Sequence, residues 1–260
     1  MPLPRFHLFE LEDQSWFPNI IRDLATDYLQ FMETKMSLHR PVVPLLTNAM
    51  RESRTTTVVD LCAGGGGPVI PLLGEMKAAG IPVRFILTDK FPNLPAFERL
   101  ARDHPGISFD RESIDATDVP ARLTGFRTVF NAFHHFKPDD ARAVLQSAVS
   151  SRQPIGIFEI PERATWIVVT TALLVPILVL LTTPFIRPFR WSRLLFTYVL
   201  PLVPLTCFWD GFVSQLRAYT PEELRRLAMS LGDVGYRWDA GKVRLQGSPA
   251  HLTYLIGQPS

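Results

Sequence analysis

Short apolar runs alternate with longer segments in which apolar residues recur every three or four positions. A short run bounded by turn residues predicts a buried strand, and the longer spacing predicts a helix with one apolar side. The alternation predicts an α/β fold with a doubly wound, largely parallel sheet. Seven strands are expected at Thr57–Asp60, Val83–Leu87, Ile107–Ile114, Phe126–Phe130, Ile155–Ile160, Tyr236–Ala240 and Leu252–Ile256, and helices at Pro18–Lys35, Val43–Arg51, Val69–Ala79, Phe97–Asp103, Pro138–Ser147 and Thr220–Gly232. The last two strands are expected to form a closing antiparallel hairpin.

The stretch from Ala164 to Trp209 departs from this alternation because it is almost entirely apolar. Its only charged side chains are Arg187, Arg190 and Arg193, which lie between two apolar arms. If the flanking strands belong to one sheet, both ends of this insertion must emerge on the same side of any membrane. Two crossings would leave the three arginines outside, against the cytoplasmic bias of Lys and Arg in short loops.

The lengths of the two arms also disfavour two crossings. The first arm, Ala164–Ile186, would measure about 34 Å as a helix, enough for a hydrocarbon core of about 30 Å. The second, Leu194–Trp209, would measure only about 24 Å, and Pro201 and Pro204 interrupt it. We therefore expect a shallow helical hairpin in one leaflet. A buried helical pair that forms a lid or a dimer interface, and a two-pass anchor, are the alternatives.

Such a shallow hairpin has residues suited to a membrane surface. The arginines would lie near anionic headgroups, and aromatic side chains would lie at the interface. These aromatic residues are Trp166, Trp191, Tyr198 and Trp209.

The net charge and the cysteines argue against several classes of protein. The formal net charge of +2 over 260 residues is too close to neutral to indicate nucleic-acid binding. Cys62 and Cys207 lie in unrelated contexts, so no disulfide framework is expected, and no metal site is predicted because the histidines lack partners at ligand spacing. The N-terminal residues lack the pattern of a secretory signal. A cytoplasmic location, at the inner face of the membrane, is expected.

The segment Thr57–Pro68, TVVDLCAGGGGP, carries the strongest chemical signal. A short strand ends in Asp60, and glycines follow whose backbone can take positive φ and bring N–H groups against a ligand. The next predicted strand also ends in an acid, Asp89. Ligands of open α/β sheets bind outside the carboxyl ends of the strands, where such an acid can hold ribose hydroxyls. A nicotinamide-binding fold is less well supported, because counting from Gly64 the third glycine of its fingerprint falls on Val69.

Together these motifs resemble those of the class I S-adenosylmethionine-dependent methyltransferases. The resemblance extends from about Thr55 to Gly257 and excludes the apolar insertion. Asp60, Gly64 and Gly66 match the family's first motif, whereas Cys62 replaces its usual first glycine. The resemblance implies a Rossmann-like seven-stranded fold and S-adenosyl-L-methionine as cofactor. The positions that it implies for cofactor binding are Asp60, Cys62, Ala63, Gly64, Gly66, Asp89 and Lys90 at the first two strands, Asp115 and Ala116 at the adenine edge, and Asn131 beside the methionine moiety.

Candidate catalytic residues follow the fourth and fifth strands. His134 and His135 lie where class I enzymes place groups that face the substrate, and a histidine can take a proton from the methyl acceptor. The two rings are expected to point in different directions, so that at most one is the base, and a purely structural turn is an equal alternative. Glu159 is an alternative base or an orienting group.

Four residues outside this core are candidates for substrate binding. Asp210 and Arg217 follow the insertion and lead back to the core, with a surface ion pair as the alternative. Trp16 and Tyr28 lie in the N-terminal region, where a lid is expected and core packing is the alternative.

The chain is expected to have four parts: an N-terminal helical lid (1–54), a cofactor-binding core (55–163), the apolar hairpin (164–209) and the rest of the core sheet (210–260). The predicted function is methyl transfer to a lipophilic or amphiphilic small molecule at a membrane surface. One alternative is a soluble methyltransferase that uses the insertion as a pocket or dimer interface, and another is a non-catalytic, membrane-associated subunit that binds the cofactor. The residues specify neither the acceptor atom nor the oligomeric state.

Overall fold

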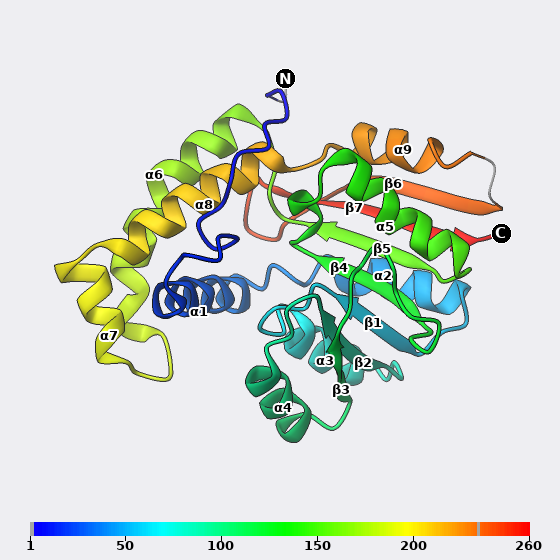
Figure 1. Ribbon diagram of the computed structural model, residues 1–260, viewed down its shortest axis with the longest axis horizontal. Coiled ribbons are helices and arrows are strands. Elements are labelled where there is room, and N and C mark those ends of the chain that lie inside the picture. Colours follow the sequence, from blue (N-terminus) through cyan, green and yellow to red (C-terminus); the bar gives the residue numbers. More distant parts are fainter. Residues whose placement is uncertain (1–2, 233–234) are drawn as a thin grey trace. The chain divides into compact units, whose positions relative to one another are not determined.

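The computed structural model describes residues 3–232 and 235–260, and the chain divides into two compact units (Figure 1). Unit 1 comprises Met1–Met36 and Pro161–Tyr219. Unit 2 comprises Ser37–Ile160 and Thr220–Ser260. Each unit is therefore assembled from two segments that are far apart in the sequence.

Unit 2 contains a seven-stranded sheet with the order β3-β2-β1-β4-β5-β7-β6. The first five strands are parallel, β7 is antiparallel to β5, and β6 and β7 form the expected closing hairpin. The predicted fold class is thereby confirmed. The strands are β1 (Thr57–Leu61), β2 (Arg84–Asp89), β3 (Ile107–Ser113), β4 (Phe126–Phe130), β5 (Ile155–Glu159), β6 (Tyr236–Arg244) and β7 (His251–Pro259).

The hairpin strands β6 and β7 are longer than the apolar pattern predicts. β6 is an edge strand, and its polar residues Lys242 and Arg244 continue the ladder to Thr253 and His251. Backbone pairing with β7 thus extends the strand beyond the residues that bury side chains.

Helices cover both faces of this sheet. α2, α3 and α4 contribute to one apolar cluster with Phe85, Phe126 and Phe158 of the sheet. α9 contacts α5 as well as β6 and β7, and its start is fixed by the predicted cap, in which Thr220 and Glu223 bond each other's backbone. The helical elements are α2 (Val42–Glu52), α3 (Val69–Ala78), α4 (Leu94–Asp103), the short η1 (Phe133–His135), α5 (Pro138–Ser150) and α9 (Pro221–Met229).

Unit 1 is helical and joins the N-terminal region to the apolar insertion. α6 packs on α8, and α1 also packs on α8. The core of the unit combines Phe17, Ile21, Leu24, Ala25 and Tyr28 of the N-terminal segment with Val179, Ile186, Val203 and Cys207 of the insertion. The elements are α1 (Asn19–Lys35), α6 (Thr165–Thr182), η2 (Thr183–Phe185), α7 (Trp191–Leu194), the π-helical η3 (Leu195–Val199) and α8 (Leu202–Arg217).

Among the described residues, one helical stretch, Thr165–Phe185, is long and apolar enough to cross a bilayer. A second such stretch exists only if Trp191–Val199 and Leu202–Arg217 are taken together, and these two are bent by 75° relative to each other.

The structure corrects the prediction that three arginines of the insertion face headgroups. Arg193 is buried, and its guanidinium donates to the Asp27 carboxylate at 2.5 Å and to the carbonyls of Ile186 and Pro188. Only Arg187 and Arg190 are exposed.

Candidate cofactor and active site

Asp60 is buried near the end of β1, just before the glycine loop. Its carboxylate accepts a hydrogen bond from the Thr128 hydroxyl at 2.9 Å, and the Thr88 hydroxyl donates to its backbone carbonyl at 3.0 Å. Asp60 is thereby held between the two neighbouring strands, β2 and β4. Cys62 follows with a φ of 60°, so a non-glycine residue takes the left-handed conformation where the family has glycine.

Cys62 is unsuited to act as a nucleophile. Burial raises the pKa of its thiol, and the carboxylates of Asp89 and Asp60 raise it further. The thiol is therefore neutral at physiological pH. Next to it, the buried Ala63 anchors the turn, because its N–H donates to the Thr88 carbonyl and its carbonyl accepts from the Gly66 N–H.

Gly66 is the glycine that the loop most strictly requires. Its φ is +103°, and a Cβ at this position would overlap the Leu100 side chain. Gly64 also has a positive φ, of +53°, but a Cβ there would meet no atom within 4 Å. We therefore expect Gly66→Ala to lower the free energy of unfolding by about 3 kcal/mol and Gly64→Ala by about 1 kcal/mol. Urea unfolding of both variants tests this difference, and equal losses would contradict it.

Asp89 connects the end of β2 to the glycine loop. One carboxylate oxygen accepts from the Gly64 N–H at 2.8 Å, and the other accepts from the Phe91 N–H at 2.8 Å. The carboxylate thus lies next to the loop, at the strand end where the sequence placed it.

Phe91 is a functional candidate that the sequence interpretation missed. It is 83% exposed, although large apolar residues are usually covered, and it lies two residues after Asp89. An exposed aromatic ring beside a ribose-type acid is suited to stack on a base. The signal was present in the sequence as an aromatic residue directly after Asp89-Lys90, outside any amphipathic pattern.

Asp115, after β3, is paired with Lys90, after β2. The Lys90 ammonium donates to one carboxylate oxygen at 2.7 Å, and Thr117 donates to the other through its N–H and its hydroxyl. The bond from Lys90 and those from Thr117 lower the pKa of Asp115 to about 2, so the carboxylate is charged at all physiological pH values. Ala116 beside it is buried.

Asn131 joins the ends of β4 and β5. It has a φ of 50°, its N–H donates to the Phe158 carbonyl at 2.9 Å, and its side-chain oxygen accepts from the Ile160 N–H at 2.9 Å. The structure thus shows a structural role for Asn131. Its predicted place beside the methionine moiety stays a prediction.

The two candidate catalytic groups after β4 and β5 form a buried pair. His134 Nδ1 lies 2.6 Å from the Glu159 carboxylate, whose other oxygen accepts from the Phe133 N–H at 2.7 Å. His134 is 2% exposed and Glu159 is 1% exposed. Because the carboxylate only accepts hydrogen bonds when ionised, it favours the imidazole tautomer that carries its proton on Nδ1. Nε2 is then the basic nitrogen of the ring.

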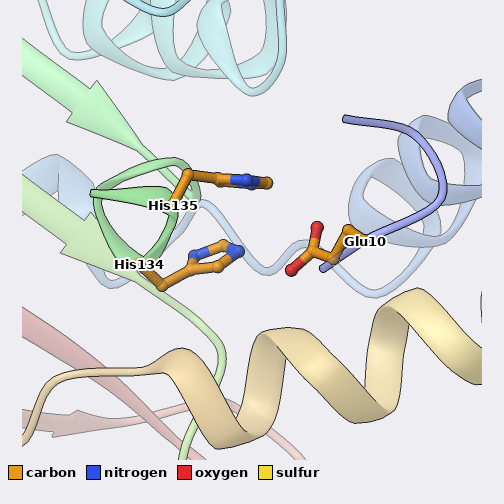
Figure 2. A group of neighbouring side chains, drawn as sticks. All are labelled: Glu10, His134 and His135. Atoms are coloured by element: carbon orange, nitrogen blue, oxygen red, sulfur yellow. The ribbon is translucent and has the colours of Figure 1, made fainter. Parts of the chain in front are cut away.

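The sequence interpretation expected the two histidine rings to point in different directions. The structure shows instead that they lie together. Their centroids are 4.3 Å apart and their planes are inclined by 35°, so the rings lie side by side (Figure 2). In the 3-10 turn η1, adjacent side chains are about 120° apart around the axis rather than on opposite sides as in a strand, so the two rings can lean together.

The four predicted substrate residues all belong to unit 1. Tyr28 is buried in the core of that unit, where burial and the nearby Cys207 raise the pKa of its hydroxyl. Trp16 is exposed and packs edge-on against Phe17. A substrate role for either residue stays a prediction.

Asp210 and Arg217 both hold the N-terminal segment onto α8, and neither forms the surface pair considered above. The Asp210 carboxylate accepts from the N–H groups of Leu11 and Glu12, at 2.7 and 3.0 Å. Arg217 is buried and donates to the Leu8 carbonyl at 2.6 Å. It also pairs with Asp13 and Glu10, at 2.9 and 3.2 Å. Their contacts are thus those of groups that stabilise unit 1.

Asp210 makes the stability of unit 1 dependent on pH. Burial raises the pKa of its carboxyl from 3.8 to about 6, although the bonds from Leu11 and Glu12 oppose the shift. The folded chain therefore binds this proton more tightly than the unfolded chain, and the stability that it contributes is lost as pH rises from about 4 to about 6. We expect the wild type to lose about 3 kcal/mol relative to Asp210→Asn over this interval. Unfolding free energies of both proteins at pH 4 and pH 7 measure the effect, and parallel pH profiles would contradict it.

Comparison with solved structures shows that the fold is similar to that of several methyltransferases. No protein-family model matches the sequence, and no curated protein matches it. Among solved structures, the plantazolicin methyltransferase BpumL, in complex with a monoazolic desmethylPZN analog and SAH, is similar with a TM-score of 0.58 and 10% identity, over 96% of each chain. The methyltransferase domain of bacterial CtHen1-C has a TM-score of 0.51 and 12% identity, over 86% of this chain and 99% of that domain.

An O-methyltransferase family protein from Burkholderia thailandensis is also similar, with a TM-score of 0.50 and 16% identity. The match covers 88% of this chain but only 58% of the Burkholderia protein. The likeness to all three proteins lies in the fold, which is the one that the sequence motifs implied. The chain has the class I S-adenosylmethionine-dependent methyltransferase fold, as its resemblance to that family predicted.

Proposed function

We propose that the protein is an S-adenosylmethionine-dependent methyltransferase whose acceptor is a lipophilic or amphiphilic small molecule at a membrane surface. The observation that carries the proposal is the meeting of a glycine loop and the acids Asp60, Asp89 and Asp115 at the carboxyl ends of β1, β2 and β3. The structural similarity to methyltransferases supports it.

The residues at this edge fit the cofactor's functional groups. Within the described part of the chain, the N–H groups of Gly65 and Gly67 donate to no other group, so they are available for the cofactor's carboxylate. Asp60 suits the ammonium group, and Asp89 suits the ribose hydroxyls. Phe91 offers an exposed ring to the adenine face.

Lys90 and Cys62 have different roles in the proposed cofactor site. Lys90 neutralises Asp115 and keeps its carboxylate in place beside Ala116, at the expected adenine edge. Cys62 supplies a left-handed backbone rather than a reactive thiol. Both residues therefore shape the site without touching the reacting atoms.

The cofactor supplies an activated methyl group, so the chain needs only to orient the acceptor and receive its proton. In the neutral Nδ1–H tautomer, His134 accepts a proton on Nε2. The Glu159 carboxylate then stabilises the imidazolium through the existing Nδ1 contact of 2.6 Å. This division makes His134 the base and Glu159 the positioning residue, and it suits an acceptor that carries a hydroxyl or another proton that leaves on methylation.

The choice of a lipophilic acceptor rests on unit 1. Its helices α6 and α8 leave many large apolar side chains exposed, which is unusual for a protein surrounded only by water. We propose that these side chains meet the inner face of the cytoplasmic membrane and that the acceptor is drawn from there.

The proposed activity is tested with purified protein, labelled S-adenosylmethionine and a lipid extract from the source cell. We expect label to enter an extractable lipophilic product. Cofactor binding by calorimetry without any labelled product from lipid or aqueous extracts would instead indicate the non-catalytic subunit, and label in water-soluble products alone would contradict the lipophilic acceptor.

A further inference from the structure

The exposed apolar residues of α6 lie on one side of the helix. Trp166, Val169, Leu173, Ile177 and Leu181 are spaced by three or four residues and are between 48% and 64% exposed. We call these five residues the apolar stripe. The opposite side of α6 is covered at Val168 and Val179, which are buried. The composition of α6 alone would also suit a membrane crossing, so its orientation depends on what packs against its covered side.

The loop that follows α6 adds aromatic and basic side chains to this surface. Phe185, Phe189 and Trp191 are exposed, Trp191 to 77%, and the exposed Arg187 and Arg190 lie among them. Asp27 of α1 is engaged by Arg193 at 2.5 Å and by Arg190 at 3.6 Å, whereas Arg187 donates to the Pro184 carbonyl. Three arginines against one aspartate leave the loop positively charged.

The covered side of the hairpin carries polar groups that oppose full insertion. α1 packs there through Ile21, Leu24 and Tyr28, which share a cluster with Val179 and Val203. The same helix carries Arg22, Asp23, Asp27, Glu33 and Lys35. A hairpin that crossed the bilayer would bring α1 and its charges into hydrocarbon, which is strongly unfavourable at that depth.

We infer that unit 1 docks on an anionic lipid leaflet with α6 parallel to the membrane plane, the apolar stripe in the acyl boundary and Arg187 and Arg190 at the headgroups. This inference deepens the membrane part of the proposed function. The occupant of the stripe is a bilayer because basic and aromatic side chains border it, which matches the charge and polarity of an anionic interface. A second copy of the chain packed symmetrically on the same surface would bring an equally basic loop against this one.

Vesicle sedimentation of the full chain tests the role of charge. We expect binding to vesicles that contain phosphatidylserine or phosphatidylglycerol and weak binding to phosphatidylcholine vesicles. Each arginine is expected to contribute about a fivefold gain in binding, so the double variant Arg187→Gln with Arg190→Gln should bind anionic vesicles about 25-fold more weakly. The matched control, Arg99→Gln with Arg226→Gln, removes the same charge from exposed helices of unit 2 and should bind like wild type.

A second measurement tests the orientation of α6. Trp166 lies at the start of α6 and Ile177 lies near its middle. In vesicles with brominated lipids, in-plane docking predicts that a tryptophan introduced by Ile177→Trp is quenched at the same shallow depth as Trp166. A crossing helix would instead place the new tryptophan at the bilayer centre, where only bromines near the chain ends quench it, and this result would overturn the inference.

The outcomes separate this inference from the enzymatic proposal. Sedimentation requires neither cofactor nor acceptor, so absence of binding to any vesicle overturns the docking surface even if labelled product forms. Concentration-dependent dimers without vesicle binding overturn it in favour of a second copy. Vesicle binding without methyl transfer supports the docking surface and contradicts the enzymatic proposal.

Discussion

The variant His134→Ala is expected to transfer methyl groups about 10²- to 10⁴-fold more slowly than wild type, with unchanged affinity for S-adenosylmethionine. This is the range by which a positioned general base accelerates proton transfer. His134 contacts the buried Glu159 carboxylate at the ends of β4 and β5, whereas the glycine loop follows β1, so cofactor binding should survive its loss. Rates are measured with labelled cofactor under single-turnover conditions, and affinity is measured by calorimetry.

Two further variants define the role of this pair. Glu159→Gln is expected to reduce the rate less than His134→Ala, because a neutral amide can still contact the ring but no longer stabilises the imidazolium. His104→Ala, at the end of α4, serves as a control and should leave the rate unchanged. A His134→Ala protein with wild-type rate would show that η1 is only a turn and that the proton leaves to water.

The second large effect concerns the cofactor. We expect Asp89→Ala to bind S-adenosylmethionine about 100-fold more weakly than wild type, because hydrogen bonds to a charged group contribute about 1.5–3 kcal/mol each. The variant loses the proposed acceptor of the ribose hydroxyls. It also loses the bonds to the N–H groups of Gly64 and Phe91 that order the loop.

Calorimetry with the free cofactor measures this loss. Asp103→Ala is a suitable control, because Asp103 is also an acid of unit 2 but lies at the exposed end of α4. Unchanged affinity in a folded Asp89→Ala protein would refute the assignment of the ribose acid and with it the cofactor proposal.

The strands of the sheet could be predicted because each of them depends mainly on a local sequence pattern. The strands β1, β2, β4 and β5 contain short apolar runs, and the acids Asp60, Asp89 and Asp115 stand close to strand ends, where a parallel sheet brings them to one edge. The pairing of His134 with Glu159 was not predictable. The two residues are 25 positions apart, and their contact follows from the neighbouring places of β4 and β5 in the sheet.

The predictions about the insertion were limited for the same reason. The composition of residues 164–209 showed that the segment is apolar. It did not show which of the few polar side chains there would form hydrogen bonds or ion pairs with other parts of the protein. Arg193 finds Asp27 across 166 positions of sequence, and Asp210 finds Leu11 across 199. Such long-range pairs depend on how the N-terminal segment packs against α8, and no local pattern encodes it.

The discontinuous make-up of unit 1 has a consequence for biosynthesis. Residues 3–36 are synthesised well before α8, on which α1 packs and which ends only at Arg217. Because domains tend to fold as their chain emerges, β1 to β5 can assemble while α1 still exposes Ile21, Leu24 and Tyr28. The apolar side of α1 therefore stays without its native partners until translation has delivered α6 and α8.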